Sequence, residues 1–283
     1  HTALRRQRQM CIRDSSTAGG ATGGTWSGGA GSWTNATDVA NATYTAGASE
    51  SGSITLTLTT SGGSCGSTTD TKNITVNENP TASAGGGLSA ICQGATSAAM
   101  GGSVAGGATG GTWSGGAGSW TNATDVANAT YTAGASESGS ITLTLTTSGG
   151  SCGSTTDTKN ITVNDPTANA GDAMSAICQG ATSAAMNGST AGGATGGTWS
   201  GGAGSWTNAS NPATATYTAG ASESGSITLT LTTSGSGCTP VTATKNITVN
   251  ENPTANAGDA MSAICQGATS AAMNGSTAGG ATG

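Results

Sequence analysis

The chain contains no phenylalanine and a single histidine, His1, and only 7% of its 283 residues are charged. With so little histidine, general acid–base catalysis, activation of a nucleophile and zinc binding all lack their usual side chain. The four arginines all lie within residues 1–13, and residues 16–283 carry three lysines against twelve acids, which excludes a basic groove for nucleic acid. No run of about 18 apolar residues occurs, so no membrane insertion is expected.

The carboxylates are too scattered to indicate catalysis. A glycosidase needs a facing pair of them, whereas each repeat offers isolated acids such as Asp125, Glu137 and Asp157, which we expect to be solvated. The glycine-rich stretch 108–111 is followed by no lysine that would hold a phosphate, so it is interpreted as a turn. We therefore predict that the chain is not an enzyme and has no catalytic or cofactor-binding residues.

What the sequence does contain is a long internal repeat. Trp26, Trp113 and Trp199 are 87 and 86 residues apart, and residues 21–77 are identical to residues 108–164. A period of this length suits a small domain better than a solenoid turn. Prolines mark the linkers, so we divide the chain into unit 1 (16–79, partial), unit 2 (80–165), unit 3 (166–252) and unit 4 (253–283, partial, with the N-terminal strands only). The chain is thus expected to be a fragment of a longer array.

Residues 1–15 do not recur anywhere in the array. Met10-Cys11-Ile12-Arg13-Asp14-Ser15 looks like a translated sequencing adapter, which makes a disordered, non-native segment the preferred interpretation. The alternative is a basic targeting arm, because arginine-rich segments can act as addresses.

The hydrophobic pattern within a unit predicts strands. Residues 141–146 alternate strictly between apolar residues and threonine, and residues 160–163 repeat this pattern, which is typical of half-buried strands. Residues 111–114 and 118–120 flank a glycine-rich connection and predict a hairpin with its two tryptophans close together. No 3.6-residue period is present. We predict an all-β fold of tandem antiparallel β-sandwiches with about seven strands each and almost no helix.

The predicted core is thin, and the cysteines are expected to reinforce it. In unit 2 it would comprise Leu88, Ile91, Met100, Val104, Trp113, Trp120, Val126, Tyr131, Ile141, Leu143, Leu145, Ile161 and Val163. Small domains often need a covalent staple, and disulfides imply an oxidising compartment.

Three arrangements of the cysteines are considered. Pairing within a unit, Cys92 with Cys152 and Cys178 with Cys238, is the preferred one. Pairing across the unit boundaries would instead join Cys65 to Cys92, Cys152 to Cys178 and Cys238 to Cys265. Free buried thiols are the third possibility. An Ig-like strand order could place Cys92 and Cys152 at opposite ends of one unit, which would argue against the first arrangement.

Several motifs resemble known extracellular repeats. Residues 166–172, Cys178-Gln179-Gly180 and Trp199 resemble the opening of PKD and related Ig-like domains. Residues 198–202, the Thr/Leu strand and the loop around Cys238 resemble tandem repeats of large cell-surface adhesins of gliding bacteria (Bacteroidota). This resemblance implies an exported, extracellular protein, and Ser and Gly after the tryptophan depart from the PKD pattern.

Two weaker sites follow from residue types alone. Trp120 and Trp206 could stack on sugars, which would make each unit a module binding glycans or other cell surfaces; the alternative is that they belong to the core. Glu78, Asp165 and Glu251 at the linkers, with Asp172 and Asp259, are candidate calcium ligands, although Gly86 replaces Asp172 in unit 2. The leading functional prediction is a stalk or spacer whose partners are the neighbouring repeats of its own chain.

Overall fold

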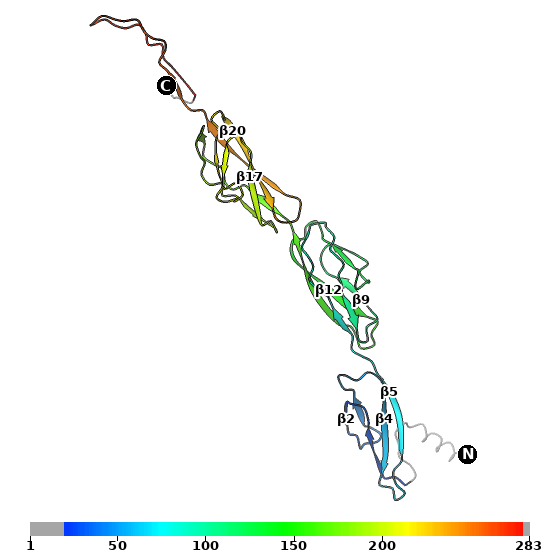
Figure 1. Cartoon of the computed structure of the whole chain (residues 1–283). Helices are drawn as coiled ribbons and strands as arrows, with labels where there is room; N and C mark the ends of the chain where they lie inside the picture. Colours follow the sequence, from blue (N-terminus) through cyan, green and yellow to red (C-terminus); the bar gives the residue numbers. More distant parts are fainter. Residues whose placement is uncertain (1–19, 280–283) are drawn as a thin grey trace.

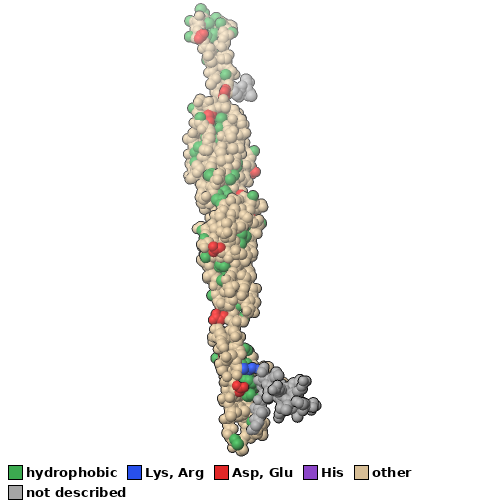
Figure 2. All heavy atoms as spheres, turned by 90° about the vertical axis from the view of Figure 1, so that its right-hand side faces the viewer, with side chains coloured by type: hydrophobic (Ala, Val, Ile, Leu, Met, Phe, Trp, Pro, Cys, Tyr) green, Lys and Arg blue, Asp and Glu red, His purple; other side chains and the backbone are tan. Residues whose placement is uncertain are grey.

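The computed structural model describes residues 20–279, and the segment 1–15 therefore lies outside the described residues. Figure 1 shows a narrow row in which three β-structured bodies follow one another, with a thin hairpin at the C-terminal end. In space-filling view the particle is long, and its visible face is mostly uncharged, with isolated acids (Figure 2). Among the described residues there is no helix, and hence none long and apolar enough to cross a membrane.

Unit 2 contains eight strands, against the seven or so predicted. They are β6 (Thr81–Ser83), β7 (Ile91–Cys92), β8 (Ser103–Ala105), β9 (Gly110–Ser114), β10 (Ser119–Thr121), β11 (Thr130–Thr132), β12 (Gly139–Ser148) and β13 (Thr156–Asn164). The main sheet has the order β7-β13-β12-β9, and the strands β6–β8 and β10–β11 form two further pairs. All pairings are antiparallel except β7 with β13, which is parallel. The predicted all-β sandwich is confirmed.

The alternation of apolar residues and threonine determines which face of the two central strands, β12 and β13, is buried. Leu143 and Leu145 point into the core and are fully buried, while Thr142 on the other face is exposed and donates a hydrogen bond to Asn160 Oδ1 at 3.0 Å. A strand exposes every second side chain, so this pattern fixes which face of the sheet is inside.

The predicted hairpin between residues 111–114 and 118–120 is wrong. β9 pairs with β12, and β10 pairs with β11. The intervening glycines carry the chain from one layer to the other instead of reversing it within one sheet. The expected closeness of the tryptophans is nevertheless found, since the rings of Trp113 and Trp120 stack with centroids 6.0 Å apart.

The core of unit 2 contains every residue predicted for it. Met100, Trp113, Tyr131 and the inward residues of β12 and β13 are buried, and the remaining predicted residues, including Trp120, pack against them partly buried. Sequence analysis missed three alanines that are also buried, Ala84, Ala129 and Ala133. Small residues let the second layer approach the sheet closely in a chain without phenylalanine.

Unit 3 repeats this arrangement with its own core between Ala170 and Val249. Its strands are β14 (Thr167–Asn169), β15 (Ile177–Cys178), β16 (Ser189–Ala191), β17 (Gly196–Ser200), β18 (Ser205–Thr207), β19 (Thr216–Thr218), β20 (Gly225–Ser234) and β21 (Thr242–Asn250), and the main sheet has the order β15-β21-β20-β17. Whether each unit folds as an autonomous domain with the predicted boundaries stays a prediction.

The two outer units hold opposite halves of the same architecture. Unit 1 has the strands β1 (Gly23–Ser27), β2 (Ser32–Thr34), β3 (Thr43–Thr45), β4 (Gly52–Ser61) and β5 (Thr69–Val76), with a three-stranded sheet β1-β4-β5 and the pair β2–β3. Unit 4 shows only the pair β22 (Thr254–Asn256) and β23 (Ser276–Ala278). Its apolar side chains Met261, Ile264 and Met273 are exposed.

Candidate functional site

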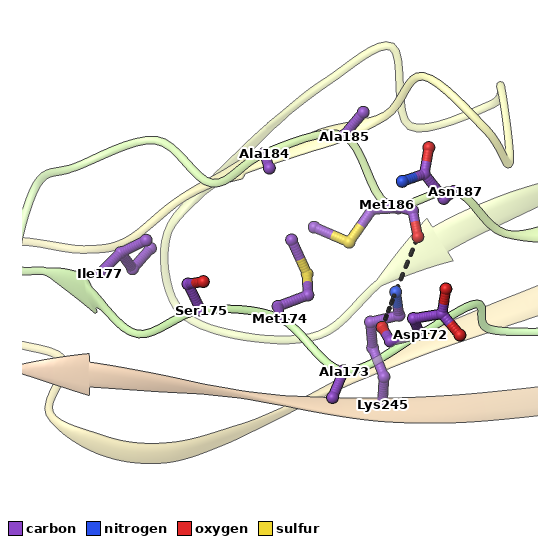
Figure 3. Close-up of a pocket in the computed structure, with 10 residues that line it drawn as sticks. All are labelled: Asp172, Ala173, Met174, Ser175, Ile177, Ala184, Ala185, Met186, Asn187 and Lys245. Carbon is purple, nitrogen blue, oxygen red and sulfur yellow. Dashed lines mark hydrogen bonds between the residues drawn. The ribbon is translucent and has the colours of Figure 1, made fainter.

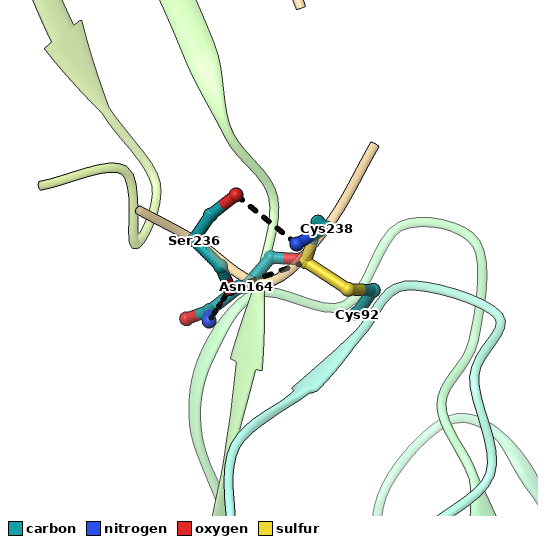
Figure 4. The surroundings of a disulfide bond; sticks show 4 residues. All are labelled: Cys92, Asn164, Ser236 and Cys238. Atoms are coloured by element: carbon teal, nitrogen blue, oxygen red, sulfur yellow. Dashed lines mark hydrogen bonds between the residues drawn. A yellow bond between two sulfur atoms is a disulfide. The ribbon is translucent and has the colours of Figure 1, made fainter. Parts of the chain in front are cut away.

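The junction between units 2 and 3 is closed by a disulfide bond. Cys92 of unit 2 is bonded to Cys238 of unit 3, 146 residues further along the chain, with their Cα atoms 5.6 Å apart (Figure 4). Cys92 reaches this position because β7 runs parallel to the last two residues of β13, with Cys92 opposite Asn164. Cys238 lies in the loop between β20 and β21. The bond therefore lies beside the linker rather than inside a core.

This finding corrects the predicted pairing of Cys92 with Cys152. Cys152 lies in the loop before β13, whereas Cys92 is beside the end of that strand. Eight residues separate Thr156 from Asn164 on β13, which corresponds to about 26 Å at roughly 3.3 Å per residue, and a disulfide needs Cα atoms within about 7 Å. The within-unit pairing of Cys178 with Cys238 is excluded as well, because Cys238 is already bonded to Cys92. The boundary-crossing set that included Cys65–Cys92 is also wrong.

The junction has polar contacts besides the disulfide. Asn164 Nδ2 donates to Ser236 O at 2.9 Å, and Cys238 Sγ lies 3.8 Å from Asn164 O. The linker also packs on a turn of unit 3, where Gly192 adopts a φ of 68° and a Cβ would collide with Asp165 O. A side chain at this glycine would push the linker away, so the turn keeps the two units close together.

The remaining described cysteines are exposed thiols: Cys65, Cys152, Cys178 and Cys265. They are not scattered. Cys152 Sγ lies 3.4 Å from Asn77 O in the linker below unit 2, just as Cys238 approaches Asn164 O in the linker below unit 3. Cys178 is opposite Asn250 at the upper end of unit 3, where Cys92 is in unit 2.

A buried tyrosine–glutamate pair holds the glycine-rich loop of each complete unit. The hydroxyl of Tyr131 donates to Glu137 Oε2, and Glu137 also accepts hydrogen bonds from the backbone N–H of Ala117 and of Gly134, each at 2.6 Å. Burial raises the pKa of Glu137, but these three donors together outweigh it and hold the pKa below its usual range. Every donor favours the ionised carboxylate, so Glu137 works here as a clamp.

Glu137 was expected to be a solvated surface acid, and that expectation is wrong, whereas Asp125 and Asp157 are exposed. The available signal was positional. A glutamate follows the tyrosine of units 1, 2 and 3 by six residues, in Tyr44 and Glu50, Tyr131 and Glu137, and Tyr217 and Glu223. A charged residue kept at a fixed distance from a core aromatic indicates a partner rather than solvent exposure.

A hollow of unit 3 is lined in part by Lys245 (Figure 3). It measures about 210 Å³ and is lined by Met174, Ile177 and Met186, among other residues. Lys245 Nζ donates to Asp172 O at 2.9 Å and to Met186 O at 2.7 Å, and it lies 5.6 Å from the ring centroid of Trp199. Burial lowers the pKa of Lys245. Its donors are directed at backbone oxygens, so the ammonium group ties the loop 172–186 to β21 instead of binding an external anion.

The residues suggested for glycan binding are half-buried. The ring of Trp120 stacks on Trp113 and is tilted by 52° against the ring of Tyr131, with centroids 5.1 Å apart. Its Nε1 donates to Gly115 O at 3.1 Å. Trp206 has the same surroundings in unit 3. Sugar stacking by either ring stays a prediction.

The candidate calcium ligands do not lie close to one another. Glu78, Glu251 and Asp259 are exposed residues in three different places, and Asp165 and Asp172 lie on opposite ends of a short loop-and-strand segment. Within residues 20–279, no three His, Cys, Asp or Glu side chains come together as metal ligands would. Calcium binding stays an untested prediction.

Comparison with known proteins yields no family: no family model and no curated protein matches the chain. Solved structures with a similar arrangement include cadherin domains 3–6 of protocadherin gamma B2 (10% identity, 85% of this chain and 72% of that one, TM-score 0.37). Mouse cadherin-23 repeats EC22–24 (12%, 83% and 89%, TM-score 0.36) and the N-terminal eight Ig domains of Down syndrome cell adhesion molecule (13%, 81% and 33%, TM-score 0.41) are others. These neighbours are tandem Ig and cadherin repeats.

Proposed function

We propose that the chain is a stalk or spacer segment of an extracellular surface protein, of the kind found in bacterial adhesins. The observation that carries this proposal is the junction of units 2 and 3, where the linker, the Asn164–Ser236 contact and the Cys92–Cys238 bond fix one unit on the end of the next. A disulfide beside a linker adds nothing to a binding pocket. It does maintain the direction and the reach of a row, which is what a spacer requires.

The composition supports the same proposal. The outer face of the main sheet presents threonine, serine and asparagine, with β12 and β13 contributing Thr142, Asn160 and Thr158 side by side. Hydroxyl and amide groups are well solvated and offer neither a large apolar patch nor a strong field to a partner. Disulfide chemistry fits an oxidising, extracellular location.

Small-angle scattering on the oxidised full chain tests the proposal. A row of units held end to end should give a maximum dimension close to the summed lengths of the units, with little change after addition of a glycan library. A compact particle would contradict the spacer function. Saturable glycan binding that is lost in Trp120→Ala and retained in the buried-site control Leu145→Val would instead support the glycan-binding alternative.

A further inference from the structure

The exposed cysteines of this chain occupy the same two positions as the bonded pair. Cys92, Cys178 and Cys265 are early cysteines at equivalent positions of units 2, 3 and 4, and Cys65, Cys152 and Cys238 are late cysteines of units 1, 2 and 3. The Cys92–Cys238 disulfide joins the early cysteine of unit 2 to the late cysteine of the following unit. Because the repeats have the same fold, the same geometry should recur at every junction between two complete units.

We propose that these cysteines form a ladder in which the early cysteine of each unit is bonded to the late cysteine of the next one. Where unit 4 is complete, Cys178 is bonded to the late cysteine of that unit. Where unit 1 is complete, Cys152 is bonded to its early cysteine. This inference concerns covalent structure, and it holds whether or not the array serves as a spacer.

Two independent positions support the ladder. Cys152 Sγ already contacts Asn77 O at 3.4 Å, so the late cysteine of unit 2 is placed on its lower linker without any bond to hold it there. At the upper end of unit 3, Gln179 N donates to Asn250 O and Gln179 Oε1 accepts from Asn252 N at 3.2 Å. The segment beside Cys178 is therefore fixed against the next linker before any partner arrives.

Bond formation is an ordinary thiol–disulfide exchange. The two cysteine thiols lose two protons and two electrons, and a disulfide donor such as oxidised glutathione takes up the electrons and is reduced to two thiols. The exposed position of Cys152 and Cys178 leaves both accessible to such a donor.

The ladder would make an array almost inextensible. A path along the ladder crosses from the early cysteine of one unit to the late cysteine of the next, and then follows the chain to the early cysteine of the unit after that. The second step corresponds to the 27 residues from Cys238 to Cys265, so the path uses one such segment for every two units. Even with all units unfolded, that segment spans about 95 Å, against roughly 600 Å for two units of unbridged chain at about 3.5 Å per residue.

Completing unit 4 tests the proposal. The sequence of residues 197–252 is appended after Gly283 in a Cys11→Ser background, the protein is refolded with oxidised and reduced glutathione, and alkylated thiols are counted by intact mass. The count should fall from four, which are Cys65, Cys152, Cys178 and Cys265, to three. In the extended chain, Cys178→Ser should restore four thiols, whereas Cys265→Ser should keep the new bond and leave two.

The outcomes separate the ladder from its alternatives. A bond that survives Cys178→Ser but is lost in Cys265→Ser would overturn the proposed register, and an unchanged count of four original thiols plus the added one would overturn the ladder. If the extended chain fails to fold, replacing residues 1–15 with the sequence of residues 166–188 provides the second test. The cysteine introduced there should protect Cys152 from alkylation, and a reactive Cys152 in the folded protein would contradict the proposal.

Discussion

Units 1 and 2 share 57 identical residues, 21–77 and 108–164, yet they bury these residues to different extents. Ile161 is 1% exposed, whereas Ile74, its counterpart, is 41% exposed. Lys159 is buried and donates to Gly86 O and Met100 O, whereas Lys72 is exposed. The difference arises from the preceding segment: residues 80–107 supply Met100 and Ala84, which pack in the core against the sheet of unit 2, and β7, which joins that sheet as an edge strand.

The comparison shows that the β12–β13 hairpin and its partner strand are specified locally, but the core is not. Unit 1 forms β1, β4 and β5 with the same register as unit 2 forms β9, β12 and β13. The main sheet therefore needs only its own alternation. Closure of the sandwich needs a segment that is remote from the hairpin in sequence, and unit 4 displays that segment without the sheet it covers.

The largest effect is expected from completing unit 1. Replacing residues 1–15 with the sequence of residues 166–188 would add copies of Ile177 and Met186 and bury Ile74. At roughly 1.5–3 kcal/mol for each large apolar side chain removed from water, unit 1 should gain about 5 kcal/mol of stability. Differential scanning calorimetry should show its low-temperature transition moving up to join those of units 2 and 3. A transition that stays in place would mean that unit 1 does not need the segment.

A matched pair of core substitutions should show the next largest difference. Leu143 is fully buried, and its counterpart Leu56 is 5% exposed beside an uncovered sheet. Leu143→Ala should lower the free energy of unfolding of unit 2 by about 3–4 kcal/mol, because the well-packed surroundings cannot collapse into the cavity that is left. Leu56→Ala should lower that of unit 1 by about 2 kcal/mol or less. Urea unfolding of the two variants measures both values. Equal costs would show that the cores are equally packed.

Glu137→Gln should have a smaller effect, about 1–2 kcal/mol, since an amide cannot accept from all three donors that the carboxylate serves. The same clamp predicts acid sensitivity. The folded pKa of Glu137 lies below its ordinary value of 4.5, so its contribution is complete above that value and is lost as the pH falls through the folded pKa. The midpoint of unfolding should fall with pH below about 4.5 in the wild-type chain and be flatter in Glu137→Gln. Identical pH profiles would rule out the clamp.

The sequence allowed the strands and the core to be predicted because both depend on alternation. The spacing of Leu143, Leu145 and Ile161 is enough to assign their side chains to the buried face of the sheet. Lys159 could have been placed inside by the same rule, because it precedes Ile161 by two residues on β13. The disulfide could not be predicted in this way. Each complete unit repeats the same two cysteines, so composition and spacing fit several pairings equally well, and only the parallel position of β7 beside β13 determines which end of the unit Cys92 occupies.

The hairpin error has a related cause. Two short apolar segments separated by glycines predict a tight reversal when each is considered alone. Gly115 and Gly116 instead allow the chain to pass from the sheet to the second layer, and Gly116 also lies against Tyr131 at a φ of 69°. Layer changes depend on packing between segments that are distant in sequence, which a local pattern does not encode.

Pulling single chains by their two ends tests most directly whether a disulfide cross-links units 2 and 3. In the oxidised chain, the Cys92–Cys238 bond spans 146 residues and shelters them from the force. Full extension should therefore be shorter by about 500 Å than after reduction, at about 3.5 Å per residue, and Cys92→Ser should behave like the reduced chain. Equal extensions before and after reduction would contradict the account, because the units would then be joined by their linkers alone.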